Sequence, residues 1–256
     1  MTLEDKIALG SETAKAGFAN EQDVIDHFNT WRKDKLAQSW LEIMGYALKD
    51  IEFVKAVKVR GSYKADVQVQ IQIIIKLKNE IDCENLSIKL VSNPKGYNQI
   101  DKRWIKKYVE LWKIDPKTEK VLKHFTGELS PYIKHTKDKR RMFANELTPQ
   151  DLKRVLDFLK KNKILIITDI LKGRGKFSAE WFLVILKDKK DKTVKPLWGL
   201  KPINEVLNFY NGEVGVTKRG SFAIGKITIQ RKGGDNGRAS ANMLQFKLNP
   251  TLLIKK

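Results

Sequence analysis

The stretch from Asp66 to Ile73 constrains the fold more than any other part of the sequence. Apolar residues at 67, 69, 71 and 73 alternate with glutamines at 68, 70 and 72. Successive side chains of a β-strand point to opposite faces, so strict alternation predicts a strand with one apolar and one polar face. Asp66 begins this strand on its polar face, together with the glutamines.

A second strand is expected over residues 86–91. If the two strands form an antiparallel hairpin with its turn near 77–83, Asp66 returns to within a few positions of Ser87 and Lys89. Directly opposed residues in such a hairpin have Cβ atoms roughly 4.5–5.5 Å apart. The hairpin therefore brings a carboxylate and an ammonium together on one polar surface.

That pairing suits phosphodiester hydrolysis. Asp66 could hold Mg²⁺, a hard ion that prefers oxygen ligands and keeps some of its waters. Lys89 could position an attacking water and stabilise charge in the transition state. The same two residues also fit a cross-strand surface salt bridge, so the pattern by itself leaves both interpretations open.

Helix and strand signals follow one another in a mixed order. Helices are expected from Ser11 to about Lys33, from Asp34 to Met44 with Gly45 beyond its end, over 100–112, from Thr148-Pro149 to about 161, and near 203–210. Later strands are expected over 164–170, 180–187, 224–231 and 242–248. This order predicts a mixed α/β or α+β fold, with a catalytic portion over 1–150 and a β-rich portion over 151–256.

The charge balance indicates the kind of partner. Fifty Lys and Arg against thirty Asp and Glu leave a net charge of +20. Such an excess repels itself in the compact state, and a polyanion would relieve the repulsion. Nucleic acid is the favoured partner, and an acidic membrane surface is the alternative.

Membrane insertion and disulfide chemistry receive no support from the sequence. The N-terminus is polar and lacks an apolar signal-peptide core, and the most apolar stretch, residues 164–171, is too short to span a bilayer. The single cysteine, Cys83, excludes an internal disulfide and a multi-cysteine zinc site. We expect Cys83 to be buried and the protein to be cytoplasmic.

Seven stretches of the chain carry a family resemblance. They are IKLVSN (88–93), GYNQIDK (96–102), HFTGEL (124–129), TKDKRRMF (136–143), TDILKGRG (168–175), TIQRKGGDNGR (228–238) and NMLQFK (242–247). They resemble the HinP-type restriction endonucleases, which cleave the tetranucleotide GCGC. The resemblance implies a PD-(D/E)xK restriction-endonuclease-like core, with a mixed central sheet flanked by helices, followed by a β-rich DNA-recognition half. It also implies Mg²⁺ dependence, 5′-phosphate ends and a companion cytosine DNA methyltransferase.

One position departs from the family pattern. The family places an Asp on the first strand and a Gln, or in most relatives a Glu, two residues before the Lys. Asp66 and Lys89 match this pattern, but position 87 is Ser. A neutral hydroxyl is a poorer metal ligand than an amide or a carboxylate oxygen, so either Ser87 binds through a water or another acidic residue compensates. The catalytic set is therefore Asp66, Ser87 and Lys89.

Glu21 on the first expected helix is the favoured additional ligand. Many nucleases of the resembling fold draw an acidic residue from that helix, which makes Asp66 and Glu21 the expected metal ligands. A solvated helical residue is the alternative for Glu21, and Asp82 and Glu84 are weaker substitutes for it.

Basic residues are expected to hold the DNA phosphates. Residues 134–141 carry five Lys or Arg in eight positions, among them Lys137, Lys139, Arg140 and Arg141. Arg174 lies in a glycine-rich turn that also suits phosphate. Such contacts position a duplex without specifying its sequence, and a solvated charged loop is the alternative.

Residues 230–238 are the favoured base-reading segment. Arg231 and Arg238 could donate in bidentate fashion to guanine, and Gln230 and Asn236 could pair with base edges. Lys232, Asn242 and Gln245 complete this set. A plain hairpin turn at Gly234–Gly237 is the alternative.

The loop after the Lys89 strand carries Tyr97, Asn98 and Gln99, which are also assigned to DNA binding. In the resembling enzymes an aromatic residue at the Tyr97 position inserts between base pairs and bends the duplex. The expected residue there is Phe, so Tyr is a second departure. A Tyr that caps the adjacent helix is the alternative.

The sequence thus predicts a Mg²⁺-dependent type II restriction endonuclease that cuts duplex DNA at a short GC-rich palindrome, GCGC by resemblance. One hairpin carries one active centre, so we expect a monomer or weak homodimer that nicks one strand at a time. A non-catalytic DNA- or RNA-binding protein with a degenerate site is the alternative, and a nuclease without sequence specificity is a third interpretation.

Overall fold

The computed structural model describes residues 21–59, 69–187, 196–233 and 238–254. Asp66 and Asn236 lie outside these residues, as does the predicted start of the first helix at Ser11. Within the described ranges, no helix is long and apolar enough to cross a membrane.

The first sheet has the spatial order β1 (Ile51–Lys58), β2 (Val69–Leu77), β3 (Ile81–Val91), β5 (Trp181–Leu186) and β6 (Leu197–Pro202). β3 and β5 run parallel, and the other neighbours run antiparallel. The expected mixed central sheet is therefore confirmed.

The expected hairpin is formed by β2 and β3. Gln70 lies opposite Ser87 and Val69 opposite Ile88, so the register brings the N-terminal end of β2 to the Lys89 region of β3. The turn over residues 78–80 is tighter than expected because both strands extend toward it. The expectation that Cys83 is buried is wrong, because the first three residues of β3 all face solvent at this tip.

The second sheet has the order β4 (Asn98–Arg103), β10 (Leu244–Leu248), β9 (Ile227–Arg231), β8 (Phe222–Ile224) and β7 (Val214–Val216), all antiparallel. Each sheet takes strands from both sides of residue 150, since β4 joins the second sheet and β5 and β6 join the first. The assignment of 1–150 to catalysis and 151–256 to DNA recognition stays a prediction.

Local capping signals define several helices as expected. α2 (Lys35–Ile43) follows helical residues 21–29, and the Asp34 carboxylate accepts from the backbone N–H groups of Leu36 and Ala37. Gly45 has φ +97°, a conformation that favours glycine just beyond a helix end. α5 (Pro149–Lys161) begins after Thr148, whose side chain accepts from Asp151 N.

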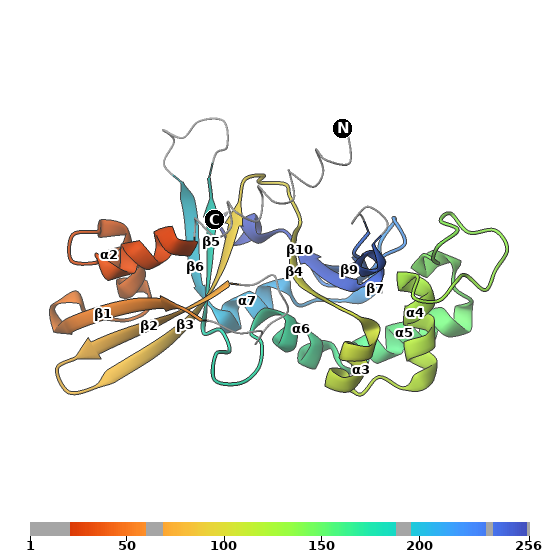
Figure 1. Ribbon diagram of the computed structural model, residues 1–256, viewed down its shortest axis with the longest axis horizontal. Coiled ribbons are helices and arrows are strands. Elements are labelled where there is room, and N and C mark those ends of the chain that lie inside the picture. Colours follow the sequence, from red (N-terminus) through yellow and green to blue (C-terminus); the bar gives the residue numbers. More distant parts are fainter. Residues whose placement is uncertain (1–20, 60–68, 188–195, 234–237, 255–256) are drawn as a thin grey trace.

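The remaining helices are α3 (Ile105–Trp112), α4 (Pro116–Thr126), α6 (Lys163–Leu171) and α7 (Ile203–Tyr210), with 3₁₀ turns η1 (Leu48–Asp50), η2 (Ala144–Glu146), η4 (Ala239–Asn242) and η5 (Pro250–Leu253). α3, α4 and α5 gather at the end of the molecule opposite the β2–β3 hairpin, and α6 and α7 lie between the two sheets (Figure 1).

Three expected elements are wrong in detail. Residues 100–112 form the end of β4 and then α3, because β4 pairs with β10, a partner distant in sequence. Residues 164–170 belong to helix α6 instead of a strand; a short apolar run without alternation does not distinguish the two. The strand expected over 224–231 is divided between β8 and β9 at Gly225, where a Cβ would clash with the Tyr210 carbonyl oxygen.

The core consists of two apolar clusters that meet across β5. Leu183 and Ile185 pack into the cluster formed with α2, whereas Phe182 and Val184 pack into the cluster formed with α6 and α7. On β3, Leu86 and Ile88 face the α2 cluster. The opposite face of β3, which carries Ser87 and Lys89, therefore points away from the α2 cluster and toward the cluster formed with α6 and α7.

Candidate functional site

Ser87 and Lys89 lie in the interior of the protein. Ser87 is 0% exposed and Lys89 is 5% exposed, because β3 is the central strand of the sheet and both of its faces are covered at this point. Ser87 Oγ is buried and has no hydrogen-bond partner among the described residues. A buried hydroxyl without a partner costs free energy, and such groups in native proteins often await a water, an ion or a ligand.

The Lys89 ammonium is held by β4, a strand of the second sheet. Its Nζ donates to the Gln99 carbonyl of β4 at 3.3 Å. Burial lowers the pKa of Lys89 to about 8, and the negative charges of Asp101 and Glu21 oppose this shift. Because Lys89 is buried, it does not form the surface salt bridge that was the alternative interpretation. Asp66, its expected partner, lies outside the described residues.

Glu21 approaches the same place from the helix over residues 21–29. It is 7% exposed, and its Oε2 accepts from Lys58 Nζ at 2.6 Å. Val24 and Phe28, farther along this helix, pack fully buried in the α2 cluster, which fixes the helix against the sheet. Glu21 is therefore not a solvated helical residue, and its charge acts on Lys89.

The described oxygen donors near Lys89 fit a hard divalent cation in type but are incomplete in number. They include the Glu21 carboxylate and the Ser87 hydroxyl, which has no hydrogen-bond partner among the described residues. The described residues contain no group of three or more His, Cys, Asp or Glu side chains that could hold a metal. Asp66, the predicted metal ligand, precedes β2 by three residues and lies outside the described part of the chain.

Asp82 and Glu84 do not complete this site. Both accept from Tyr46 Oη, and Glu84 also accepts from Trp181 Nε1 at 2.9 Å. Glu84 precedes Lys89 by five residues on an extended strand, which corresponds to roughly 17 Å. Burial raises the pKa of Glu84. The shared contacts with Tyr46 place Asp82 and Glu84 in a separate cluster near the hairpin turn.

A buried charge network continues from the Lys89 region. Asp101 on β4 pairs with Arg103, which also donates to Asp169 Oδ2 on α6 at 3.0 Å. Arg174, expected to contact phosphate, instead donates from Nε to Asp169 Oδ1 at 2.6 Å. Its side chain remains partly exposed, so the structure gives Arg174 a structural partner and leaves its contact with DNA a prediction.

Two segments distant in sequence bring their arginines together. The loop over residues 134–141 places Arg141 beside Arg231 of β9, and their like charges repel. Arg141 stacks on Phe143 with its guanidinium carbon 4.0 Å from the ring centre. Its buried Nε lies 3.7 Å from Asp138 Oδ2 and has no hydrogen-bond partner among the described residues. Burial lowers the pKa of both arginines. Crowded cations of this kind suit an external anion.

Asn242 holds Arg231 in place. Its Oδ1 accepts from Arg231 Nε at 3.1 Å and from Nη2 at 2.7 Å, and its Nδ2 donates to the Gly127 carbonyl. Gly127 has φ +88°, and a Cβ there would meet the Arg140 carbonyl oxygen at 2.7 Å. The end of α4, the basic loop and β9 thus pack at one point.

The other base-reading residues differ in exposure. Gln245 is buried, and its Nε2 donates to the carbonyls of Arg231 and Lys232, so it positions β9 and is not a surface group. Gln230 and Lys232 are partly buried and Arg238 is exposed. Asn236 and the glycines of the alternative hairpin turn lie outside the described residues.

The remaining predicted contacts are at the surface. Lys137, Lys139 and Arg140 are exposed, and Arg140 pairs with Asp138. Tyr97 is 54% exposed in the loop between β3 and β4, where no described hydrogen bond ties it to a helix. Asn98 Nδ2 donates to the Leu90 carbonyl at 3.3 Å, and Gln99 supplies the carbonyl that Lys89 contacts.

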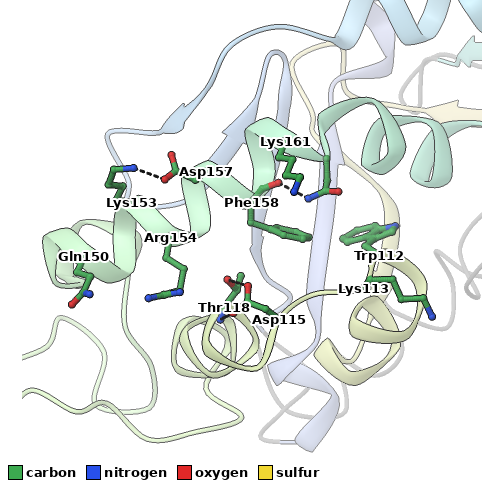
Figure 2. A pocket seen from close by; sticks show the side chains of 11 residues that line it. Trp112, Lys113, Asp115, Thr118, Gln150, Lys153, Arg154, Asp157, Phe158 and Lys161 are labelled. Carbon is green, nitrogen blue, oxygen red and sulfur yellow. Dashed lines mark hydrogen bonds and ion pairs between the residues drawn. The ribbon is translucent and has the colours of Figure 1, made fainter.

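A groove of 640 Å³ lies elsewhere, between α5 and the α3–α4 connection (Figure 2). Its walls carry Trp112 and Phe158 together with charged residues of both signs, and Lys153 pairs with Asp157 at its rim. None of the predicted site residues lines it. This groove is therefore not the candidate site.

Asp101 was missed by sequence reasoning. It is 1% exposed and acts on Lys89, but the sequence placed it inside an expected helix over 100–112, where it would have faced solvent or a helix neighbour. Ile100 lies between two polar residues, and an alternation of polar and apolar residues over only three positions is too short to predict a strand.

The architecture is shared with a solved nuclease. A crystal structure of restriction endonuclease MspI in complex with its cognate DNA aligns with a TM-score of 0.62, covering 89% of this chain and 87% of that chain at 17% identity. No curated protein sequence matches. The mixed central sheet, the covering helices and the second sheet define a PD-(D/E)xK-like restriction endonuclease fold.

The family model described as R.HinP1I restriction endonuclease matches residues 44–254. The chain therefore belongs to the R.HinP1I restriction endonuclease family, whose members are type II restriction endonucleases that act on DNA.

Proposed function

We propose that this protein hydrolyses duplex DNA at a short GC-rich palindrome, GCGC by resemblance, with Mg²⁺ at a site centred on Asp66 and Lys89. The observation that carries the proposal is the buried Lys89 on β3, two residues from a buried Ser87 hydroxyl that has no partner among the described residues. β3 pairs with β2, the strand that follows Asp66. Charged groups are expensive to bury, so a buried lysine with a lowered pKa is typical of a functional site.

Asp66 and Glu21 are the proposed metal ligands, with Ser87 acting through a bound water. When bound, Mg²⁺ would polarise the scissile phosphate and lower the pKa of a coordinated water. The residues of the chain supply orientation. Lys89, held by the Gln99 carbonyl, would position the attacking water and stabilise the charge that develops on the phosphate. Water adds to phosphorus and the 3′ oxygen leaves, which gives the 5′-phosphate end.

Binding of the duplex is assigned to the basic loop over residues 134–141, to β9 and to the loop between β3 and β4. Lys137, Lys139 and Arg140 would contact phosphates, whereas Arg231, held by Asn242, would read guanine. Exposed Tyr97 would act as the wedge between base pairs. The likeness to MspI, whose structure is a complex with cognate DNA, supports a duplex as the substrate.

The test is a digest of unmethylated phage DNA with Mg²⁺, followed by four short duplexes that differ only in the GC palindrome: GCGC, CGCG, CCGG and GGCC. Discrete fragments, with only the GCGC duplex cut, would support the whole proposal. Asp66→Ala and Lys89→Ala should abolish cutting, and Asp157→Ala on exposed α5 is the matched carboxylate control.

Two results would replace the proposal. Retardation of DNA without any cutting in Mg²⁺ or Mn²⁺ would favour a binding protein whose site was degraded by Ser87. A continuous smear would favour a nuclease without sequence specificity. Calcium in place of magnesium should retain binding and prevent cutting.

Assembly and cellular context extend the proposal. A single active centre in a monomer or weak homodimer would nick one strand at a time, so nicked circles should accumulate before linear DNA when a supercoiled plasmid is digested. A companion cytosine methyltransferase would protect the host. Cytoplasmic location stays a prediction.

A further inference from the structure

The groove between α5 and the α3–α4 connection is separate from the candidate catalytic site. α3, α4 and α5 lie at the end of the molecule opposite the β2–β3 hairpin (Figure 1), and no described candidate site residue lines the groove. Its volume of 640 Å³ falls within the range of roughly 300–1,000 Å³ that is typical of ligand sites. A ligand bound here would therefore leave the place of the scissile phosphate free.

One face of α5 presents a cation, an aromatic ring and a second cation to this groove. Arg154, Phe158 and Lys161 follow one another at spacings of four and three residues, which places them on one side of the helix. The two cations are seven residues apart, or about 10 Å along the helix axis. Phe158 is partly buried, and Figure 2 shows it extending from α5 toward Trp112 on the opposite wall.

The carboxylates of the groove are already engaged by other groups of the protein. Asp115 caps α4: its Oδ1 accepts from the backbone N–H groups of Lys117 and Thr118 at 3.0 Å, and its Oδ2 accepts from Thr118 Oγ1 at 2.6 Å. Asp157 pairs with Lys153 at the rim. Neither acidic side chain is therefore left to neutralise the cations on the α5 face.

The charge of the groove favours an anionic ligand. Its lining carries four Lys or Arg and two Asp side chains, which gives a net charge of +2. Among the described residues, Lys113, Arg154 and Lys161 form no ion pair, whereas the fourth cation pairs with Asp157. Cations that face one concave surface without counter-charges attract an external anion.

The length of the groove and its aromatic wall indicate which anion fits. On α5 the lining runs from Gln150 to Asn162, about 18 Å along the helix, so the groove suits a chain better than a small ion. A single strand of DNA offers phosphates to the cations and an open base face to Phe158, and the exposed Gln150 amide can bond to a base edge. A duplex keeps its base faces inside the stack, and an acidic peptide has none.

We propose that this groove binds single-stranded DNA, with phosphates on Arg154 and Lys161 and a base stacked on Phe158. The inference goes beyond the proposed function and does not depend on it, because binding of the strand needs neither Mg²⁺ nor the catalytic centre. A strand held here leaves the cleavage site free for a duplex.

The test is the fluorescence anisotropy of labelled hexathymidylate, which does not pair with itself, in magnesium-free buffer. Lys161→Gln should weaken binding about fivefold or more relative to the matched control Lys160→Gln. Each variant removes one exposed cation from neighbouring positions of α5, but Lys160 does not line the groove. Equal affinities of the two variants would overturn the proposal, because binding would then follow net charge alone.

Three other ligands test the base contact on the unaltered protein. An abasic hexamer carries the phosphates without bases, hexaglutamate carries carboxylates only, and thymidine 5′-monophosphate reaches only one cation. Each should bind about fivefold or more weakly than hexathymidylate. Any one of them that binds as tightly would overturn the proposal: the groove would then bind any polyanion, an acidic peptide or a free nucleotide, respectively.

Phe158→Leu and a competing duplex locate the strand. Phe158→Leu keeps an apolar side chain against the core and removes the flat ring, so hexathymidylate and the abasic hexamer should bind this variant equally. An excess of unlabelled GC-rich duplex, which occupies the basic loop and β9, should leave hexathymidylate bound. Full displacement by the duplex would place the strand at the duplex site and overturn the proposal, whether or not the protein cuts DNA.

Discussion

The half of the molecule around Lys89 on β3 and the half around the basic loop and β9 use positive charge in opposite ways. On β3 a single lysine is buried, held by a backbone carbonyl and influenced by two carboxylates. Where the 134–141 loop meets β9, Arg140, Arg141 and Arg231 lie close together and repel one another, with Asp138 as their described counter-charge. The first arrangement is complete for orientation, whereas the second gains from a bound polyanion.

The difference indicates which half should govern which property of the reaction. A buried group that acts on the reacting atoms affects the rate after binding. Cations at the surface affect affinity and its salt dependence. If the comparison holds, substitutions in the two halves should separate cleavage rate from DNA affinity.

The largest expected effect is on β3. Lys89→Ala should slow single-turnover cleavage by roughly 10²–10⁴-fold, because it removes the group that we propose orients the nucleophile and stabilises transition-state charge. The dissociation constant in Ca²⁺, measured by gel retardation, should change less than about threefold. Equal losses in rate and affinity would break the comparison, since Lys89 would then act as a binding cation.

Arg231→Ala should have the next largest effect. It should change recognition of the DNA sequence and leave the cleavage rate of bound DNA unchanged. Loss of one bidentate guanine contact should weaken binding to the cognate duplex by about 1–3 kcal/mol, roughly 5- to 150-fold, and binding to unrelated DNA far less. Competition binding with the four GC palindromes measures this. Arg154→Ala, in the groove of Figure 2, is the control and should leave discrimination intact. A uniform loss on all duplexes would assign Arg231 to phosphate.

Ser87→Ala sharpens the comparison inside the catalytic half. The buried hydroxyl has no partner in the described structure, so its removal should leave the free energy of unfolding unchanged or raise it by about 1 kcal/mol. The Mg²⁺ concentration for half-maximal cleavage should rise by about tenfold, as expected for a ligand that acts through water. Urea unfolding and metal titration test both parts. A clear loss of stability with an unchanged metal requirement would give Ser87 a packing role only.

The smallest effect concerns salt. Replacing Lys137 and Lys139 with Gln should reduce the slope of log affinity against log salt by about 0.9 for each phosphate that is no longer neutralised. Cognate and unrelated duplexes should be affected alike, with cleavage at saturation unchanged. The control replaces Lys153 and Lys161 on α5, and a reduced slope there would move the DNA path toward the groove of Figure 2.

Elements with a local cause were predictable from the sequence. Asp34 and Gly45 delimit α2, and Thr148 with Pro149 begins α5, because caps and fixed φ angles act within a few residues. The β2–β3 hairpin followed from alternation, and the resemblance supplied the fold class. Residues 164–171 lacked any such signal, and their helical form depends on burial among neighbours.

The sequence by itself therefore determined the hairpin, the choice of Lys89 as the candidate catalytic lysine, and the excess of positive charge. Only the tertiary structure decided that Lys89 is buried, that Glu21 and Asp101 act on it from other elements, and that Arg141 meets Arg231 from a distant part of the chain. The physical reason is that hydrogen bonds, caps and alternation are local, whereas desolvation and charge interactions depend on which distant segments pack together.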